Sequence, residues 1–148
     1  MKTILLIIFL YPVHVFAPPH LSKQDVIKAW EFHYLTQPFT PALLNSALEL
    51  YVKYPKIALA QSKLETGYFT SDIWKENKNL FGMKHPKIRP TYSMGEARKS
   101  AVYNHWLYSV KDYRLMQDWY FDRGKDMDYF LTVYCPGKHY KRTVKNLM

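Results

Sequence analysis

One glutamate lies in an otherwise apolar and small-residue stretch, IALAQSKLETGYFT. Ile57, Ala60 and Leu64 recur at helical spacing and predict a core face, and Gly67 is placed to end the helix. Glu65 then falls in the last turn, where partial burial and the helix dipole both raise the pKa of a carboxyl group. A carboxylic acid that keeps its proton near neutral pH suits general acid catalysis of glycoside cleavage. The alternative is a surface glutamate that caps its own loop.

Other reactive side chains are scattered along the chain. The six histidines form no His-x-His or His-Glu-x-x-His pattern and Cys135 is the only cysteine, so neither a metal site nor a cofactor is expected. Cys135 and His139 have the spacing of a nucleophile pair. A lone cysteine beside a proline is, however, more often a small buried residue.

The composition indicates one globular domain. With 148 residues, 48% of them hydrophobic and 22% charged, the chain is long enough for one sizeable core. The net charge of +9 favours anionic polymers or membrane surfaces as partners. Nucleic acid is not expected, because no long lysine and arginine run occurs and the chain carries an export signal.

That signal is the N-terminal sequence MKTILLIIFLYPVHVFA. A lysine, an unbroken apolar run and small residues before a cleavage point predict a secretory signal peptide over 1–17, too short to span a bilayer. A buried strand is the alternative interpretation. The mature protein would be a single domain over 18–148, a monomer in the secreted or periplasmic space with no membrane span left after cleavage.

Several local signals predict that this domain is mostly helical. Capping boxes at 22–25 and 109–112 and cap-proline pairs at 40–41 and 54–55 mark helix starts. Further helices are expected over 126–134 and from 138 onward.

Between the third helix and the 109–112 box, the chain changes character. Residues 77–90 show no period and contain Gly82, Pro86 and Pro90, which predicts a structured loop. Residues 91–103 are expected to form a small β-hairpin that turns at Gly95.

Two segments, AQSKLETGYFTS and ENKNLFGMKH, resemble the glucosaminidase-type peptidoglycan hydrolases, glycoside hydrolase family seventy-three of the lysozyme-like superfamily. In that family an Ala-Gln-x-x-x-Glu-[Ser/Thr]-Gly helix carries the catalytic acid and an Asn-Leu-Phe-Gly-[Ile/Met/Val]-Lys loop shapes the cleft. Here these elements are 60–67, with Glu65 as the acid, and 79–84. The resemblance runs in order from about residue 55 to the C-terminus. It implies a mainly α, lysozyme-like domain whose β-hairpin forms one side of the cleft.

The resemblance also implies roles for aromatic and basic residues. The segment YCPGKHYKRTV resembles the family's Tyr-Ala-x-x-x-x-Tyr stretch and places Tyr134 near the cleft floor. Phe81, Tyr103 and Tyr140 would line or support the groove, although aromatic residues at helical spacing usually belong to the core. Lys84 would meet carboxylates of the polymer or remain a solvated loop lysine.

The second catalytic group is less well defined. Glycosidases usually use two carboxylates, and family members often carry one on the hairpin in a Thr-x-Glu-Tyr setting. Residues 91–93 of this chain hold no acid, which leaves Glu96 as the nearest replacement. Asp72 and Glu76 are fallback candidates, and attack by the N-acetyl group of the sugar itself is a third possibility.

These features predict a secreted endo-β-N-acetylglucosaminidase that cuts β-1,4 bonds in the glycan strands of peptidoglycan. One alternative keeps the fold but cuts the other linkage, as a muramidase or a lytic transglycosylase. The other is a catalytically silent cell-wall-binding protein that retains Glu65 without a partner carboxylate.

Overall fold

The computed structural model describes residues 22–148, so the predicted signal peptide lies outside the described residues. The chain divides into two units at residues 37 and 38, so the described residues of the first are 22–37 and the second is 38–148. In the first, helix α1 (Lys23–Thr36) begins at the predicted capping box: the hydroxyl of Ser22 accepts from the backbone N–H of Asp25, whose carboxylate accepts from Ser22 in return. No helix within 22–148 combines the length and the apolar character needed to cross a membrane.

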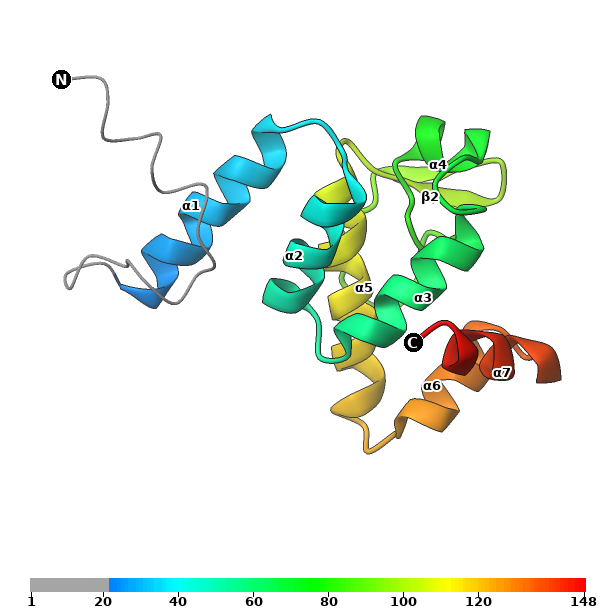
Figure 1. Ribbon diagram of the computed structural model, residues 1–148. Coiled ribbons are helices and arrows are strands. Elements are labelled where there is room, and N and C mark those ends of the chain that lie inside the picture. Colours follow the sequence, from blue (N-terminus) through cyan, green and yellow to red (C-terminus); the bar gives the residue numbers. More distant parts are fainter. Residues whose placement is uncertain (1–21) are drawn as a thin grey trace, which may run out of the picture. The chain divides into compact units, whose positions relative to one another are not determined.

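The second unit, residues 38–148, holds every residue assigned to the candidate site and is mainly helical, with one small antiparallel hairpin (Figure 1). This combination of helices with one small β-hairpin is consistent with a lysozyme-like helical domain. Its elements are α2 (Pro41–Tyr51), α3 (Pro55–Glu65), α4 (Asp72–Asn77), β1 (Gly95–Ala97), β2 (Ser100–Val102), α5 (Trp106–Phe121), α6 (Met127–Tyr134) and α7 (Lys138–Asn146).

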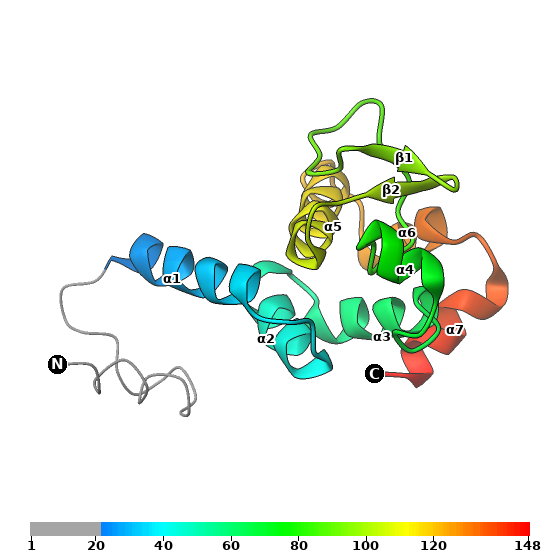
Figure 2. The same ribbon diagram turned by 90° about the horizontal axis from the view of Figure 1, so that it is seen from above.

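Helix packing brings distant segments together around α3. Helix α2 contacts both α3 and α5, and α7 packs against α3 although more than 70 residues separate them. The hairpin lies beside α4 in both orientations of the ribbon (Figures 1 and 2). Large apolar side chains that are fully buried come from α2, the loop after α4, α5, α6 and α7: Leu44, Leu48, Leu80, Phe81, Leu107, Val110, Tyr113, Phe130, Leu131 and Val144.

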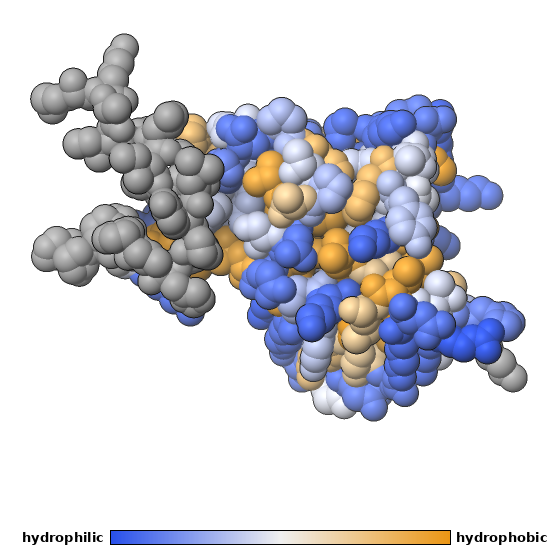
Figure 3. All heavy atoms as spheres, viewed as in Figure 1, coloured by the Kyte–Doolittle hydropathy of each residue, from blue (hydrophilic) through white to orange (hydrophobic). Residues whose placement is uncertain are grey.

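The surface of this unit is mixed in character. On the face drawn in Figure 3, apolar residues reach the surface toward the centre, while hydrophilic residues follow the right-hand and lower edges. Exposed apolar side chains are spread over several elements and include Tyr68, Ile88 and Met94.

The end of α3 follows the sequence prediction closely. Gly67 adopts φ +56°, and the N–H groups of Gly67 and Tyr68 donate to the carbonyls of Leu64 (3.3 Å) and Lys63 (2.7 Å). This pair of bonds is a Schellman motif, which satisfies the last carbonyls of the helix and stops it just after Glu65.

The predicted core face of α3 is only partly correct. Ala60 is buried, but Ile57 and Leu64 are half-buried, and the residues that join Ala60 inside are Ala58, Gln61 and Ser62. Two of these buried residues are polar, so apolar spacing alone could not identify the buried side of this helix.

Two other local predictions were wrong. Helix α5 begins at Trp106 with His105 as its N-cap, and the supposed capping-box residues Ser109 and Asp112 are buried inside the helix. The hairpin turns at Arg98 and Lys99 and not at Gly95, which opens β1. Both turn residues have positive φ, as a two-residue type I′ turn requires. The sequence prediction also missed the short helix α4.

Candidate active site

Glu65 is the last residue of α3 and is half-buried. Its Oε1 accepts a hydrogen bond of 2.8 Å from the hydroxyl of Tyr140 on α7. Burial raises the pKa of the Glu65 carboxyl group, and this outweighs the lowering by the Tyr140 hydrogen bond. The position at a helix C-terminus disfavours negative charge as well. The carboxyl group therefore holds its proton to a higher pH than an exposed glutamate does.

Gly82 lies against the other oxygen of the same carboxyl group. Its φ is +59°, and a Cβ atom at this position would lie 2.6 Å from Oε2 of Glu65. Both facts require glycine, one because of the left-handed backbone and one because of the close approach. A side chain at residue 82 would therefore meet the Glu65 carboxyl group and force it to shift.

Replacing Gly82 with alanine is expected to displace the Glu65 carboxyl group and to lower any catalytic activity that depends on this group at least tenfold. The positive φ should cost roughly 1–3 kcal/mol of stability in addition. Gly124→Ala is the matched control, because Gly124 has φ +71° but no atom within 4 Å of its Cβ position. Denaturant unfolding should show both variants destabilised, and activity assays should show only Gly82→Ala inactivated. Full activity in Gly82→Ala would refute the role given to this contact.

Asn79 holds the loop that carries Gly82. Its side-chain amide donates to the carbonyls of Met83 (2.8 Å) and Ala101 (3.1 Å) and to the hydroxyl of Ser100 (2.8 Å), and its oxygen accepts from the backbone of Phe81 and Met83. Asn79 is 2% exposed. It ties the loop to β2 and so fixes the backbone that faces Glu65, a role that the motif 79–84 contains but that sequence reasoning did not assign.

Two tyrosines lie in the site with Glu65: Tyr134 at the end of α6 and Tyr140 on α7. The rings of Tyr134 and Tyr140 are stacked, with centroids 6.1 Å apart and planes 17° from parallel. Tyr134 donates to the carbonyl of Phe81, next to Gly82. Burial first, and then the charge of Glu65, raise the pKa of both hydroxyls. Both tyrosines therefore remain neutral hydrogen-bond donors beside the carboxyl group.

The other predicted groove residues have different surroundings. Phe81 is fully buried and stacks on Tyr113 with ring centroids 4.3 Å apart. Tyr103 is 2% exposed and donates to the buried carboxylate of Asp112 at 2.7 Å. Neither ring is available to a sugar, so both support the site from the core. Lys84 is exposed at the edge of the loop.

The candidate second carboxylates are all exposed. Glu96 is on β1, Glu76 pairs with Arg98 of the hairpin turn at 3.1 Å, and Asp72 lies in the first turn of α4. Within 22–148, no second carboxylate is hydrogen-bonded to Glu65 or to the two site tyrosines. Glu65 is therefore the acidic group that the fold itself brings into this cluster.

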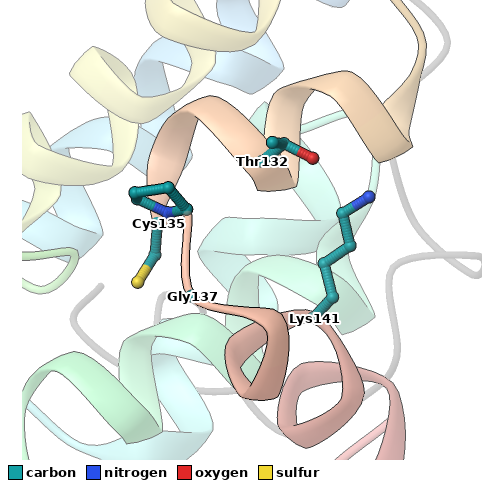
Figure 4. Close-up of a pocket in the computed structure, with 5 residues that line it drawn as sticks. Thr132, Cys135, Gly137 and Lys141 are labelled. Atoms are coloured by element: carbon teal, nitrogen blue, oxygen red, sulfur yellow. The ribbon is translucent and has the colours of Figure 1, made fainter.

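A separate pocket lies between α6 and α7 (Figure 4). Its volume is about 270 Å³, and Lys141 extends from α7 along one side of it. It is lined by Thr132, Cys135, Pro136, Gly137 and Lys141, so Glu65 is not part of its wall. His139 accepts from Arg142 at 2.9 Å and does not pair with Cys135. The part of the chain that the structure describes holds no group of three or more potential metal ligands.

The chain was compared with known protein families, curated proteins and solved structures. The comparisons with curated proteins and with solved structures gave no match. The family model Glucosaminidase, described as mannosyl-glycoprotein endo-beta-N-acetylglucosaminidase, matches residues 42–148. That range is more than half of the chain and includes Glu65, the Gly82 loop, the hairpin and both site tyrosines. The chain therefore belongs to the glucosaminidase family.

Proposed function

We propose that this protein is a secreted peptidoglycan hydrolase, an endo-β-N-acetylglucosaminidase that cleaves β-1,4 bonds with Glu65 as general acid. Membership of the glucosaminidase family gives a glycoside hydrolase type of function. The observation that carries the finer proposal is the half-buried Glu65 carboxyl group, held between Tyr140 and Gly82 with a raised pKa. The apolar N-terminus supports export, and the net charge of +9 favours an anionic polymer.

In the proposed reaction Glu65 donates its proton to the glycosidic oxygen as the bond to the anomeric carbon breaks. The carboxylate left behind keeps the hydrogen bond from Tyr140, which stabilises the negative charge as it forms. Tyr134 does not take part in the proton transfer itself. By donating to the carbonyl of Phe81, it holds the loop backbone that packs on Glu65.

For the second group we propose Glu96. It is paired directly with Ala101 in the hairpin register, and cross-strand partners project from the same face of a sheet. Ala101 is fully buried, and its N–H donates to the carbonyl of Met83, beside Gly82. The Gly82 loop therefore runs along the outer edge of β2, and Glu96 projects from the same face of the hairpin as the buried Ala101. This role requires a movement of the strands that brings Glu96 over the substrate.

Glu96→Gln is expected to lower the rate of cleavage by about 10²-fold, within the usual contribution of a general base. The control is Glu76→Gln, which removes an exposed carboxylate that already pairs with Arg98. Rates on purified peptidoglycan would be compared for the two variants. If Glu96→Gln cleaves as fast as the parent, Glu96 is not the second group, which leaves Asp72, Glu76 and attack by the N-acetyl group of the sugar as the alternatives.

The pH dependence of cleavage should report the protonation of Glu65. Because the acid must carry a proton, kcat/KM should fall as pH rises through the raised pKa of Glu65. In Tyr140→Phe the hydrogen bond that lowers this pKa is lost, so the alkaline limb should move to higher pH while the rate declines. A limb that stays in place in this variant would argue that another group controls it.

The proposed bond specificity is tested by the products released from purified peptidoglycan. Mass spectrometry of the fragments should find N-acetylglucosamine at the new reducing ends. N-acetylmuramic acid there would indicate a muramidase, and anhydro ends a lytic transglycosylase. Tight binding to sacculi without any released fragments would support the non-catalytic alternative.

A further inference from the structure

A directed chain of hydrogen bonds leads from the core to Glu65. The hydroxyl of Tyr113 on α5 donates to Oε1 of Gln61, and Nε2 of Gln61 donates to the hydroxyl of Tyr140 at 3.2 Å. Tyr140 in turn donates to Oε1 of Glu65 at 2.8 Å. Gln61 and Glu65 lie one turn apart on the same side of α3. The four side chains therefore form one continuous path from α5 through α3 and α7 to the acid.

Gln61 sets the direction of this path. An amide has one end that only accepts and one that only donates, so a glutamine that accepts from Tyr113 must donate to Tyr140. The Tyr140 oxygen then already receives a proton, and its own single proton is left for Glu65. Gln61 is fully buried, which leaves water no access to compete for these bonds.

We propose that Gln61 is a positioning residue that directs the Tyr140 proton onto Oε1 of Glu65 and thereby leaves the transferable proton on Oε2. This rests on the proposed function, in which Glu65 is the general acid. An oxygen that accepts a hydrogen bond from a neighbour serves as the carbonyl oxygen of the neutral acid. The other oxygen, Oε2, faces the exposed Gly82. The proton that Glu65 gives to the substrate is thus assigned to Oε2.

The surroundings of the path keep each tyrosine a donor. Burial raises the pKa of Tyr113, and burial and then the charge of Glu65 raise that of Tyr140. Tyr134, from α6, is the third hydroxyl near this cluster and is held by the Phe81 carbonyl. Gln117 partly offsets the effect of burial on the pKa of Tyr113 through a side-chain hydrogen bond. Within 22–148, no lysine, arginine or histidine is hydrogen-bonded to any member of the path.

The test uses the full chain with ¹³C-labelled glutamate side chains, so that the Glu65 carboxyl group can be titrated by NMR independently of activity. Gln61→Met keeps the length of the side chain. In this variant the midpoint of the Glu65 titration should rise by about 0.5 pH unit or more, because the Tyr140 hydroxyl is no longer oriented to donate to the ionised Glu65 carboxylate. We expect kcat to fall about tenfold, equivalent to one hydrogen bond of roughly 1.4 kcal/mol, with KM within about twofold of the parent. Ser62→Ala is the matched control: Ser62 is a neighbouring buried polar residue on α3 that donates only to the carbonyl of Leu59.

A double-mutant cycle separates positioning from a general packing role. In a Tyr140→Phe background, Gln61→Met should cause no further shift of the Glu65 midpoint, because the connection is already cut. A further shift of equal size there, or an unchanged midpoint and kcat in folded Gln61→Met, would overturn the proposal. If Gln61→Met does not fold, Tyr113→Phe should move the midpoint in the same direction, and no movement would overturn it. If the parent cleaves no glycan but Gln61→Met still shifts the midpoint of the Glu65 titration, the proposed function is refuted and the positioning role of Gln61 stands.

Discussion

Replacing Arg89 with methionine is expected to lower the free energy of unfolding by about 3–5 kcal/mol, the usual effect of removing one partner of a buried ion pair. Arg89 contacts both carboxylate oxygens of Asp112, at 2.8 and 3.3 Å, and the side chains are 8% and 0% exposed. Without the guanidinium group, the Asp112 charge would keep only the hydroxyl of Tyr103 and the N–H of Tyr92 as partners. Urea unfolding of the parent and the variant measures the difference.

The matched control is the same substitution in an exposed ion pair. Arg98→Met removes the contact with Glu76, whose side chains are 54% and 53% exposed, and should cost less than about 1 kcal/mol. Adding Asp112→Asn to Arg89→Met should recover part of the lost stability, because it removes the unpaired charge but keeps an acceptor for Tyr103. Equal losses for Arg89→Met and Arg98→Met would contradict the account of a buried pair.

This ion pair also explains why one sequence prediction was wrong. Ser109 and Asp112 have the spacing of a capping box, but the carboxylate of Asp112 pairs with Arg89, which lies 23 residues earlier in the chain. Ser109 donates to the carbonyl of Trp106 and accepts from the N–H of Leu80. A capping box needs hydrogen bonds between residues close in sequence. Here the side chains of Ser109 and Asp112 instead form hydrogen bonds with the distant residues Leu80 and Arg89. No property of residues 109–112 alone could reveal this.

The hairpin shows a related limit. Its existence could be predicted from the short strand-like segments, but its turn could not, because Arg98 and Lys99 adopt the left-handed conformation usually given to glycine or asparagine. Gly95 was the more probable turn residue by type. The two-residue turn is instead set by the strands that flank it and by Asn77, whose side chain donates to the carbonyls of Ala97 and Ser100.

The site itself was predictable where local geometry decides. Helix periodicity and Gly67 place Glu65 in the last turn of a helix with partial burial, and the structure has it there, half-buried at the end of α3. The supporting residues depend on long-range packing: Phe81 was expected to line or support the groove and is buried in the core, while Gly82 meets the acid. Gln61 was missed because a polar residue was not expected on the buried face. Its position four residues before the acid was the signal available in the sequence.

Replacing Glu65 with glutamine is expected to have the largest effect on activity. Glutamine keeps the shape of the side chain and its oxygen can still accept from Tyr140, but it has no acidic proton to give. The fold should not suffer. Burial raises the pKa of Glu65, so the stability that it contributes is present at low pH and is lost as pH rises through that pKa. At neutral pH the variant should therefore be at least as stable as the parent.

The most direct test of the general acid is the release of soluble glycan fragments and new reducing ends from purified peptidoglycan by the parent and by Glu65→Gln, at equal concentration and with equal melting temperatures confirmed. The account predicts clear release by the parent and a loss of roughly 10²–10⁴-fold in the variant. Equal release by the two proteins would contradict the role of Glu65.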